Sequence, residues 1–196
     1  MNITTKLLHL DSSILGEHSA SRPLGAAVVA RWQDAVPGLD VTYRDLAAQP
    51  LPHLSGGSLA GADAAETAEA ERVMREFLEA DVLVVGAPMY NFGVPSTLKA
   101  WIDRIAVAGK TFRYTETGPQ GLAGGKKVVI ASSRGGFHQD NGADFQEAYL
   151  RQVFGFLGIT DIEIVRAEGL AVSPEQRSAS MASAYESIRA PLAEAA

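Results

Sequence analysis

The stretch from Val82 to Ile105 constrains the fold of this 196-residue chain more than any other. It begins with an apolar run rich in β-branched residues, a pattern typical of a strand buried on both faces of a parallel sheet. From Leu98 to Ile105 the apolar residues return at helical spacing, and Pro95 suits a first helical turn. A strand followed at once by a helix predicts an α/β sheet, in which ligands bind outside the carboxyl ends of the strands.

The loop between this strand and helix contains Met89, Tyr90, Asn91 and Phe92. Turns with a purely structural role favour Gly, Asp, Asn and Ser, so two aromatic rings, a thioether and an amide are unusual there. Their chemistry suits a flat, conjugated ring with polar edges. The alternative is that the apolar side chains only seal the end of the sheet, since apolar residues near strand ends are usually core.

Five strand-like segments alternate with helical ones, and neither an internal repeat nor a linker divides the chain. The strand-like segments are Thr5–Leu10, Leu39–Arg44, the run from Val82, Lys127–Ser132 and Asp161–Val165. The second and fifth alternate with polar residues and are expected at the sheet edges, because strands in the middle of a parallel sheet are nearly all apolar. The flavodoxin-like order 2-1-3-4-5 has these edges, whereas the dinucleotide-binding fold needs a sixth strand and a Gly-rich fingerprint after the first. We therefore predict one domain over residues 1–196, a three-layer, doubly wound α/β fold with a five-stranded parallel sheet.

Apolar periodicity predicts five helices between and after these strands. The first helix is expected to begin within Ser19–Arg22, the second to include Val73–Leu78, and the third to follow Pro95. The fourth is expected to include Tyr149–Leu157, and the fifth to run from Ser173 to Leu192. Two segments show no helical period. Residues 47–65 are expected to form a long functional or mobile loop. Residues 109–125 are expected to form a short ribbon with a turn at Gly118-Pro119. The sequence leaves the conformation of both segments open.

Charge and composition exclude several classes of protein. The net charge is −6 and there is no basic stripe, so a nucleic-acid partner is not expected. The chain has no cysteine and its four histidines are scattered, which speaks against disulfides, a cysteine nucleophile and a zinc site. No apolar run reaches the ~18 residues of a membrane span, and the first strand starts too early for a signal-peptide core. A cytoplasmic protein without membrane contact is expected.

The first strand is followed by a hydroxyl-rich loop, Ser12–Ser21, that leads into a helix. Hydroxyls and free N–H groups at a helix N-terminus form an anion site that needs no lysine. Ser13, Ser19 and Ser21 are therefore candidate phosphate ligands. Serine is also a preferred helix cap, so one of Ser19 and Ser21 is expected to cap the helix in either case.

The fourth strand is followed by Ser133, Arg134, Gly135 and Gly136. Paired glycines permit positive φ and a close approach of the backbone, so their N–H groups suit the carbonyl edge of a ring. The alternative is an ordinary glycine turn. Special loops after strands one, three and four all fall on one rim of the sheet, which favours a ligand site. By contrast, no P-loop and no Gly-x-Ser-x-Gly elbow is present.

Together these stretches resemble the FMN-dependent NADH-azoreductase family, which also reduces quinones. The resemblance is carried by Asp11–Leu15, Ser19–Ser21, Ala87–Phe92, Thr111–Thr115, Ser132–Gly136 and Ala167–Gly169. It implies that Ser13, Ser19, Ala20 and Ser21 hold the phosphate and ribityl end of FMN. It also implies that Met89–Phe92 and Ser133–Gly136 contact the isoalloxazine ring. Ala20 stands where the family often has glutamine, so only a backbone contact carries over. The family is homodimeric, with sites near the subunit interface.

The expected function is an oxidoreductase in which FMN carries the chemistry and no side chain acts as general acid or base. NADH or NADPH would reduce the flavin, and a quinone or an aromatic azo compound would then take both electrons in a ping-pong cycle. The alternatives are a flavodoxin-like electron carrier or flavin-binding module, and an esterase-type phosphodiesterase. Electron carriers tend to be strongly acidic for docking, whereas this chain is only mildly acidic. A phosphodiesterase would need a nucleophile motif or a metal cluster, and this sequence shows neither. The sequence names neither the acceptor nor the preferred nicotinamide.

Overall fold

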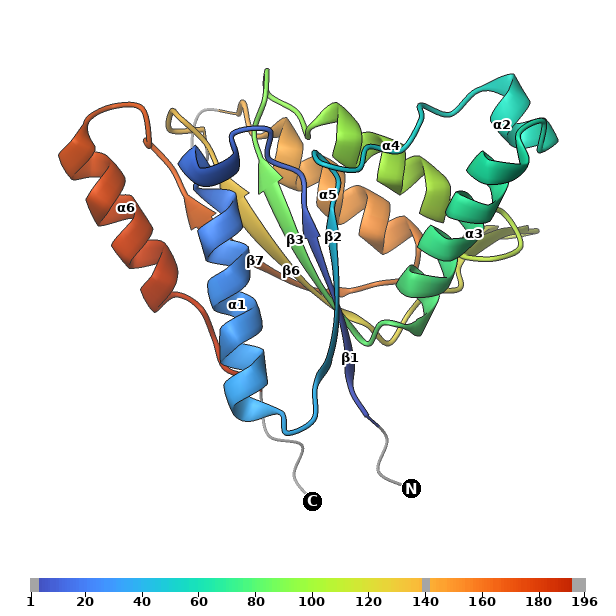
Figure 1. Ribbon diagram of the computed structural model, residues 1–196, viewed down its shortest axis with the longest axis horizontal. Helices are drawn as coiled ribbons and strands as arrows, with labels where there is room; N and C mark the ends of the chain where they lie inside the picture. The colour runs from blue at the N-terminus through green and yellow to red at the C-terminus, as the bar shows by residue number, and fades with distance from the viewer. Residues whose placement is uncertain (1–3, 139–141, 192–196) are drawn as a thin grey trace.

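The computed structural model describes residues 4–138 and 142–191, and its centre is a five-stranded parallel sheet (Figure 1). The strands are β1 (Lys6–Asp11), β2 (Asp40–Asp45), β3 (Val82–Pro88), β6 (Lys127–Ser133) and β7 (Asp161–Ala167). Their order is β2-β1-β3-β6-β7, which confirms the predicted order with both alternating strands at the edges. The predicted strand limits differ from the observed ones by one or two residues.

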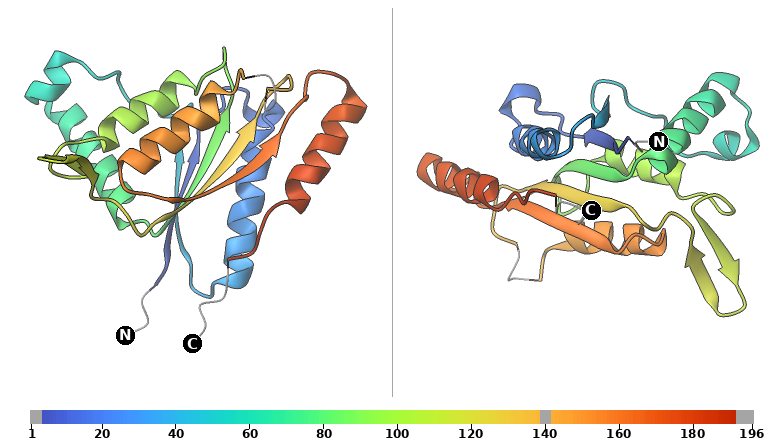
Figure 2. Two further views of the ribbon diagram at one scale, coloured as in Figure 1. Left: turned by 180° about the vertical axis from the view of Figure 1, so that it is seen from behind. Right: turned by 90° about the horizontal axis from the view of Figure 1, so that it is seen from below.

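Helices cover both faces of the sheet, as Figures 1 and 2 show. On one face lie α1 (Ser21–Ala35) and α6 (Pro174–Glu186), and on the other lie α3 (Ala64–Glu79), α4 (Ser96–Ile105) and α5 (Phe145–Phe156). The last helix ends at Glu186, earlier than predicted, and Leu192 lies outside the described residues. Within the described ranges, no helix combines the length and apolarity needed to cross a lipid bilayer.

The core is split into two apolar layers by the sheet, with β3 at its centre and all seven of its residues buried. Leu83 and Val85 pack toward α3, α4 and α5, while Val82 and Val84 pack toward α1 and α6. Full burial of each such side chain contributes about 1.5–3 kcal/mol, so the middle strands form a rigid platform. The loops that leave their carboxyl ends are therefore held in fixed relative positions.

The segment 47–65 contains regular structure that the sequence prediction missed. A short helix, α2 (Gly56–Ala60), begins after Ser55, whose hydroxyl accepts from the Ser58 N–H while the Ser58 hydroxyl accepts from the Ser55 N–H. This capping box has serine at its fourth position in place of the usual Glu or Gln, which hides it in the sequence. Arg104 of α4 secures the segment by donating to the Pro52 carbonyl at 2.9 Å and pairing with Glu66 at 2.6 Å.

The segment 109–125 forms the predicted ribbon, which projects from the body of the molecule in Figure 2. Its strands are β4 (Phe112–Thr115) and β5 (Gly118–Gly121), paired antiparallel. Gly118 and Pro119 lie in β5, so the turn falls between Thr115 and Gly118 and the predicted turn position was wrong. Pro119 is tolerated because this strand lies at the edge of a two-stranded sheet.

Candidate functional site

The three loops singled out in the sequence meet at the carboxyl rim of the sheet, because β1, β3 and β6 are neighbours. The Tyr90 hydroxyl lies 3.2 Å from the Ser13 hydroxyl and accepts a hydrogen bond from the Ile14 N–H, also at 3.2 Å. The Met89 N–H donates to the Ser133 carbonyl at 2.8 Å. Direct hydrogen bonds thus join the first loop to the second and the second to the third.

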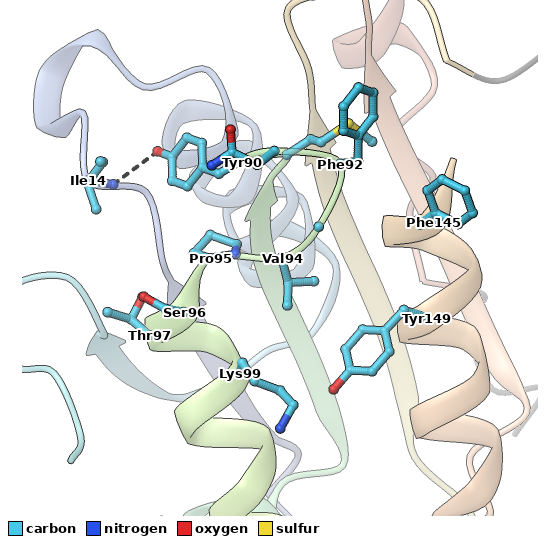
Figure 3. Close-up of a pocket in the computed structure, with 13 residues that line it drawn as sticks. Ile14, Tyr90, Phe92, Val94, Pro95, Ser96, Thr97, Lys99, Phe145 and Tyr149 are labelled. Carbon is cyan, nitrogen blue, oxygen red and sulfur yellow. Dashed lines mark hydrogen bonds between the residues drawn. The ribbon is translucent and has the colours of Figure 1, made fainter. Parts of the chain in front are cut away.

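A cavity of about 1000 Å³ opens beside the loop that follows β3 (Figure 3). It is lined by Ile14, by residues 89–97 with Lys99, and by Phe145 and Tyr149 of α5. The predicted residues Met89–Phe92 therefore form one wall, whereas the predicted serines and glycines lie elsewhere on the rim. The lining residues of α5 were missed, because aromatic residues at helical spacing give the same pattern as core positions.

The loop that lines this cavity contains a tight turn with unusual backbone angles. Tyr90 and Gly93 exchange two backbone hydrogen bonds of 3.0 Å, and between them Asn91 has φ +50° and Phe92 has φ +65°. Such a two-residue turn prefers Asn followed by Gly, and a bulky residue in the second position is strained by about 1–2 kcal/mol. Phe92 is 54% exposed, and its ring lies edge-on to that of His138. An exposed aromatic ring held at a conformational cost is a mark of a functional site.

The serine loop presents unpaired donors at the start of α1. The Ser19 hydroxyl accepts from the Arg22 N–H at 3.2 Å and lies 3.2 Å from the Ser21 hydroxyl. Ala20 occupies the N-cap position of α1, so neither serine is the N-cap residue, but Ser19 still satisfies one N–H group of the first turn. The N–H groups of Ala20 and Ser21 donate to no group in the described part of the chain. Hydroxyls and free N–H groups at the positive end of a helix form an anion site.

Arg22, which follows this loop, is occupied within the protein. Its guanidinium binds both carboxylate oxygens of Asp45, at 2.8 and 2.9 Å, and donates to the Ser13 carbonyl at 2.9 Å. These hydrogen bonds hold the pKa of Asp45 below its ordinary value. Nearby Asp11 lies 3.7 Å from the same guanidinium, and burial raises the pKa of Asp11. The candidate phosphate site is therefore built from neutral donors, because the charge of Arg22 is already compensated.

The glycine loop is attached to the segment after β7 on one side. The Gly135 carbonyl accepts from Ala171 and the Gly136 carbonyl accepts from Gly169, each at 3.0 Å. The N–H groups of Gly135 and Gly136 themselves find no acceptor among the described residues. Two adjacent free donors thus stand on the loop that follows β6, and such donors can stabilise negative charge on a bound group.

The structure contradicts one of the two predicted reasons for glycine at these positions, and the close approach to a ligand stays a prediction. Neither Gly135 nor Gly136 has a positive φ, so the expected left-handed backbone was wrong. A Cβ atom on Gly135 would lie 3.2 Å from the Cβ of Ala171, and one on Gly136 would lie 3.0 Å from His138 Nε2. Close packing against the protein's own loops therefore favours glycine here, most clearly at Gly135.

Arg134 and Ser133 occupy less exposed places than the prediction implied. Ser133 is buried at the end of β6, where its carbonyl accepts from the Met89 N–H. Arg134 is 2% exposed, and its guanidinium contacts Asp144, Glu147 and Glu168 in the interior. Its backbone N–H donates to the carbonyl of Ala167 at the end of β7, and its carbonyl accepts from the Leu170 N–H. The guanidinium of Arg134 therefore faces carboxylates of the protein, although its Nε has no hydrogen-bond partner among the described residues, and a contact of Arg134 with a cofactor stays a prediction.

Residues 5–192 match the family described as having the flavodoxin-like fold, and the chain belongs to this family. It is 62% identical over 183 residues to the FMN-dependent NADH:quinone oxidoreductase of Stenotrophomonas maltophilia, a match covering 93% of this chain and 94% of that protein. An azoreductase from Bacillus anthracis is 31% identical, with a TM-score of 0.84 over 94% of this chain and 97% of the azoreductase. A second B. anthracis protein, described as an FMN-dependent NADH-azoreductase in complex with FMN, is 25% identical, with a TM-score of 0.85 over 95% and 96% of the two chains.

Proposed function

We propose that the protein is an FMN-dependent NAD(P)H oxidoreductase that reduces quinones and aromatic azo compounds by two-electron transfer. The observation that carries the proposal is the meeting of a serine loop, a strained aromatic loop and a free glycine pair on one rim. The same assignment is supported by 62% identity to an FMN-dependent NADH:quinone oxidoreductase and by the fold shared with azoreductases.

The free donors at the rim fit FMN at two separate places. The hydroxyls of Ser13, Ser19 and Ser21, with the N–H groups of Ala20 and Ser21, would hold the phosphate and the ribityl chain. The N–H groups of Gly135 and Gly136 would bind the carbonyl edge of the ring, while Met89–Phe92 would cover it. When bound, FMN supplies the capacity to accept a hydride from NADH and to pass two electrons on.

The protein's own contribution is binding, orientation and electrostatic stabilisation. Donors fixed at the ring edge stabilise the negative charge that develops there on reduction, without reorganising. Among the described residues that line the cavity, Lys99 alone is charged, and its ammonium is paired with Asp103 at 2.5 Å. The proposal therefore assigns no side chain the role of general acid or base.

The cavity is the proposed place of the electron acceptor. Its walls are mostly apolar and aromatic, which suits a planar aromatic molecule such as a quinone. Ile14, Phe92 and Phe145 at its border are 67%, 54% and 63% exposed. We propose that a second subunit covers them, so that the protein works as a homodimer. We further propose that residues 1–196 form one domain and that the protein resides in the cytoplasm.

A direct assay separates this proposal from an electron carrier or a flavin-binding module. The cavity beside the cofactor loops favours an enzyme, because a carrier has no need of an acceptor pocket of this size. The purified protein should be yellow, and it should oxidise NADH or NADPH in the presence of menadione. A yellow protein without this turnover would support the carrier, and a colourless protein that does not take up FMN would refute both. Comparing NADH and NADPH over a quinone panel would identify the donor and the acceptor class.

A further inference from the structure

Arg134 lies in a buried ionic cluster directly beneath the glycine loop. One terminal nitrogen of its guanidinium, Nη1, is 2.9 Å from Asp144 and 3.4 Å from Glu168. The other, Nη2, donates to the Ser132 hydroxyl at 3.0 Å and also pairs with Glu147. The guanidinium itself is inaccessible to solvent, and its charge is balanced by these carboxylates, although its Nε and Nη1 have no hydrogen-bond partner of good geometry among the described residues.

The cluster joins three segments that are separate in the sequence. Asp144 and Glu147 belong to the start of α5, and Glu168 follows β7. Glu168 also accepts from the His138 N–H at 3.1 Å, which fixes the far end of the glycine loop. Arg166 of β7 shares Glu147 through a hydrogen bond of 2.8 Å. One guanidinium thus determines how the floor of the site, the glycine loop, sits relative to α5 and β7.

Burying this many charges is costly unless each is well paired, and apolar packing would often serve stability equally well. The location of the cluster offers a reason for its presence, because Arg134 immediately precedes the two residues with free N–H groups. The backbone bonds to Ala171 and Gly169 fix one side of this loop, and the ion pairs of the guanidinium tie it to Asp144, Glu147 and Glu168. Small movements of the loop would reorient both donors at once.

We propose that Arg134 is a positioning residue that aims the N–H groups of Gly135 and Gly136 at the ring of the cofactor and thereby sets its reduction potential. This inference rests on the proposed FMN-dependent function. Negative charge accumulates at the ring edge on reduction, so well-aimed donors bind the reduced cofactor more tightly than the oxidised one. Loss of this alignment must therefore lower the midpoint potential of the bound cofactor.

Arg134→Lys tests the role because it keeps the charge and removes the planar fork that spans three carboxylates. Arg104→Lys is the matched control. Arg104 is also buried (6% exposed) and pairs with Glu66, but it lies in the last turn of α4, away from the carboxyl rim. The measurements are the midpoint potential of the FMN-loaded proteins, the Kd for oxidised FMN, and the thermal stability of each protein without FMN.

In Arg134→Lys, we expect at least a tenfold loss of the preference for the reduced cofactor, a fall in midpoint potential of about 30 mV or more. The Arg104→Lys control should stay within about twofold of wild type, or about 9 mV by the same constant. If Arg134→Lys does not fold, Ser132→Ala removes one acceptor from Arg134 without changing any charge. Ser132→Ala should also lower the midpoint potential, with at least about a twofold loss of the preference for the reduced over the oxidised cofactor.

A wild-type potential in Arg134→Lys would overturn the inference, whatever its melting temperature, since a merely structural cluster alters stability alone. An unchanged potential in Ser132→Ala would overturn it if the lysine variant is unfolded. Failure of the proposed function gives a different result, because the wild-type protein itself would then bind no FMN, and the inference falls with it.

Discussion

Replacing Ser19 with aspartate separates the two roles that this residue combines. Its hydroxyl satisfies an N–H group in the first turn of α1 by accepting from Arg22 at 3.2 Å, and it also lies where the FMN phosphate is proposed to bind. Aspartate caps helices as well as serine does, so the fold should tolerate the change. A phosphate beside the new carboxylate would not, because both groups carry negative charge.

The expected loss follows from the burial and the charges around Ser19. Two unit charges about 4 Å apart repel by roughly 4 kcal/mol at an effective dielectric constant of about 20, and a dianionic phosphate increases this repulsion. Ser19 is 4% exposed, which limits screening by water. Arg22 offers little relief, since its guanidinium already binds Asp45 through two hydrogen bonds. We therefore expect the Kd for FMN to rise at least about 100-fold, where each 1.4 kcal/mol is tenfold.

Flavin fluorescence quenching gives the Kd values for FMN and for riboflavin, which lacks the phosphate. Riboflavin should bind wild type weakly and lose little further affinity in Ser19→Asp. The matched control is Ser19→Asn, because asparagine has the shape of aspartate and also caps helices but carries no charge. It should bind FMN far more tightly than Ser19→Asp does. If Ser19→Asp binds FMN like wild type, the phosphate lies elsewhere and this placement of the cofactor is refuted.

Four further outcomes are expected. Phe92→Gly should leave the protein without FMN at least as stable, because glycine relieves the strain at φ +65°. It should weaken FMN binding about two- to twelvefold, as removal of an aromatic contact worth about 0.5–1.5 kcal/mol does. The pKa of Asp45 is lowered by Arg22, so Asp45→Asn should show its full loss of unfolding free energy near neutrality and a shrinking loss below about pH 4. Light scattering should give twice the mass of one chain, and a fully active monomer at micromolar concentration would contradict this. Steady-state kinetics should give parallel double-reciprocal lines, whereas intersecting lines would rule out a ping-pong cycle.

The strand order could be predicted because burial leaves a direct trace in the sequence. All seven residues of β3 are buried, and they form the uninterrupted apolar run that begins at Val82. The edge strands alternate because one of their faces is partly open to solvent. Once the order is known, the chain's unusual loops must fall on one rim, so the candidate site followed from the same pattern.

The ionic networks could not be predicted, because each partner depends on tertiary placement. Arg44 stands on the polar face of an alternating strand, yet it is 5% exposed and is held by Glu69 and Glu76 of α3. Arg22 precedes its partner Asp45 by 23 positions. A sequence shows that such residues are charged, but it does not show which of them will meet. The same limit applies to Gly135, since a glycine required by close packing and one required by positive φ are identical in sequence.

The two pairs of free donors also differ in what they can control. Strands in a sheet lie about 4.8 Å apart, so the loops after β1 and β6 are separated by about 10 Å across β3. A ligand that satisfies both must carry an anion at one end and ring carbonyls at the other. The phosphate keeps its charge when the ring is reduced, so Ser19→Asp should weaken the oxidised and reduced cofactor equally and leave the midpoint potential unchanged. A change beneath the glycine loop should move the potential. A potential shift in Ser19→Asp as large as in Arg134→Lys would mean that the two ends of the rim do not act separately.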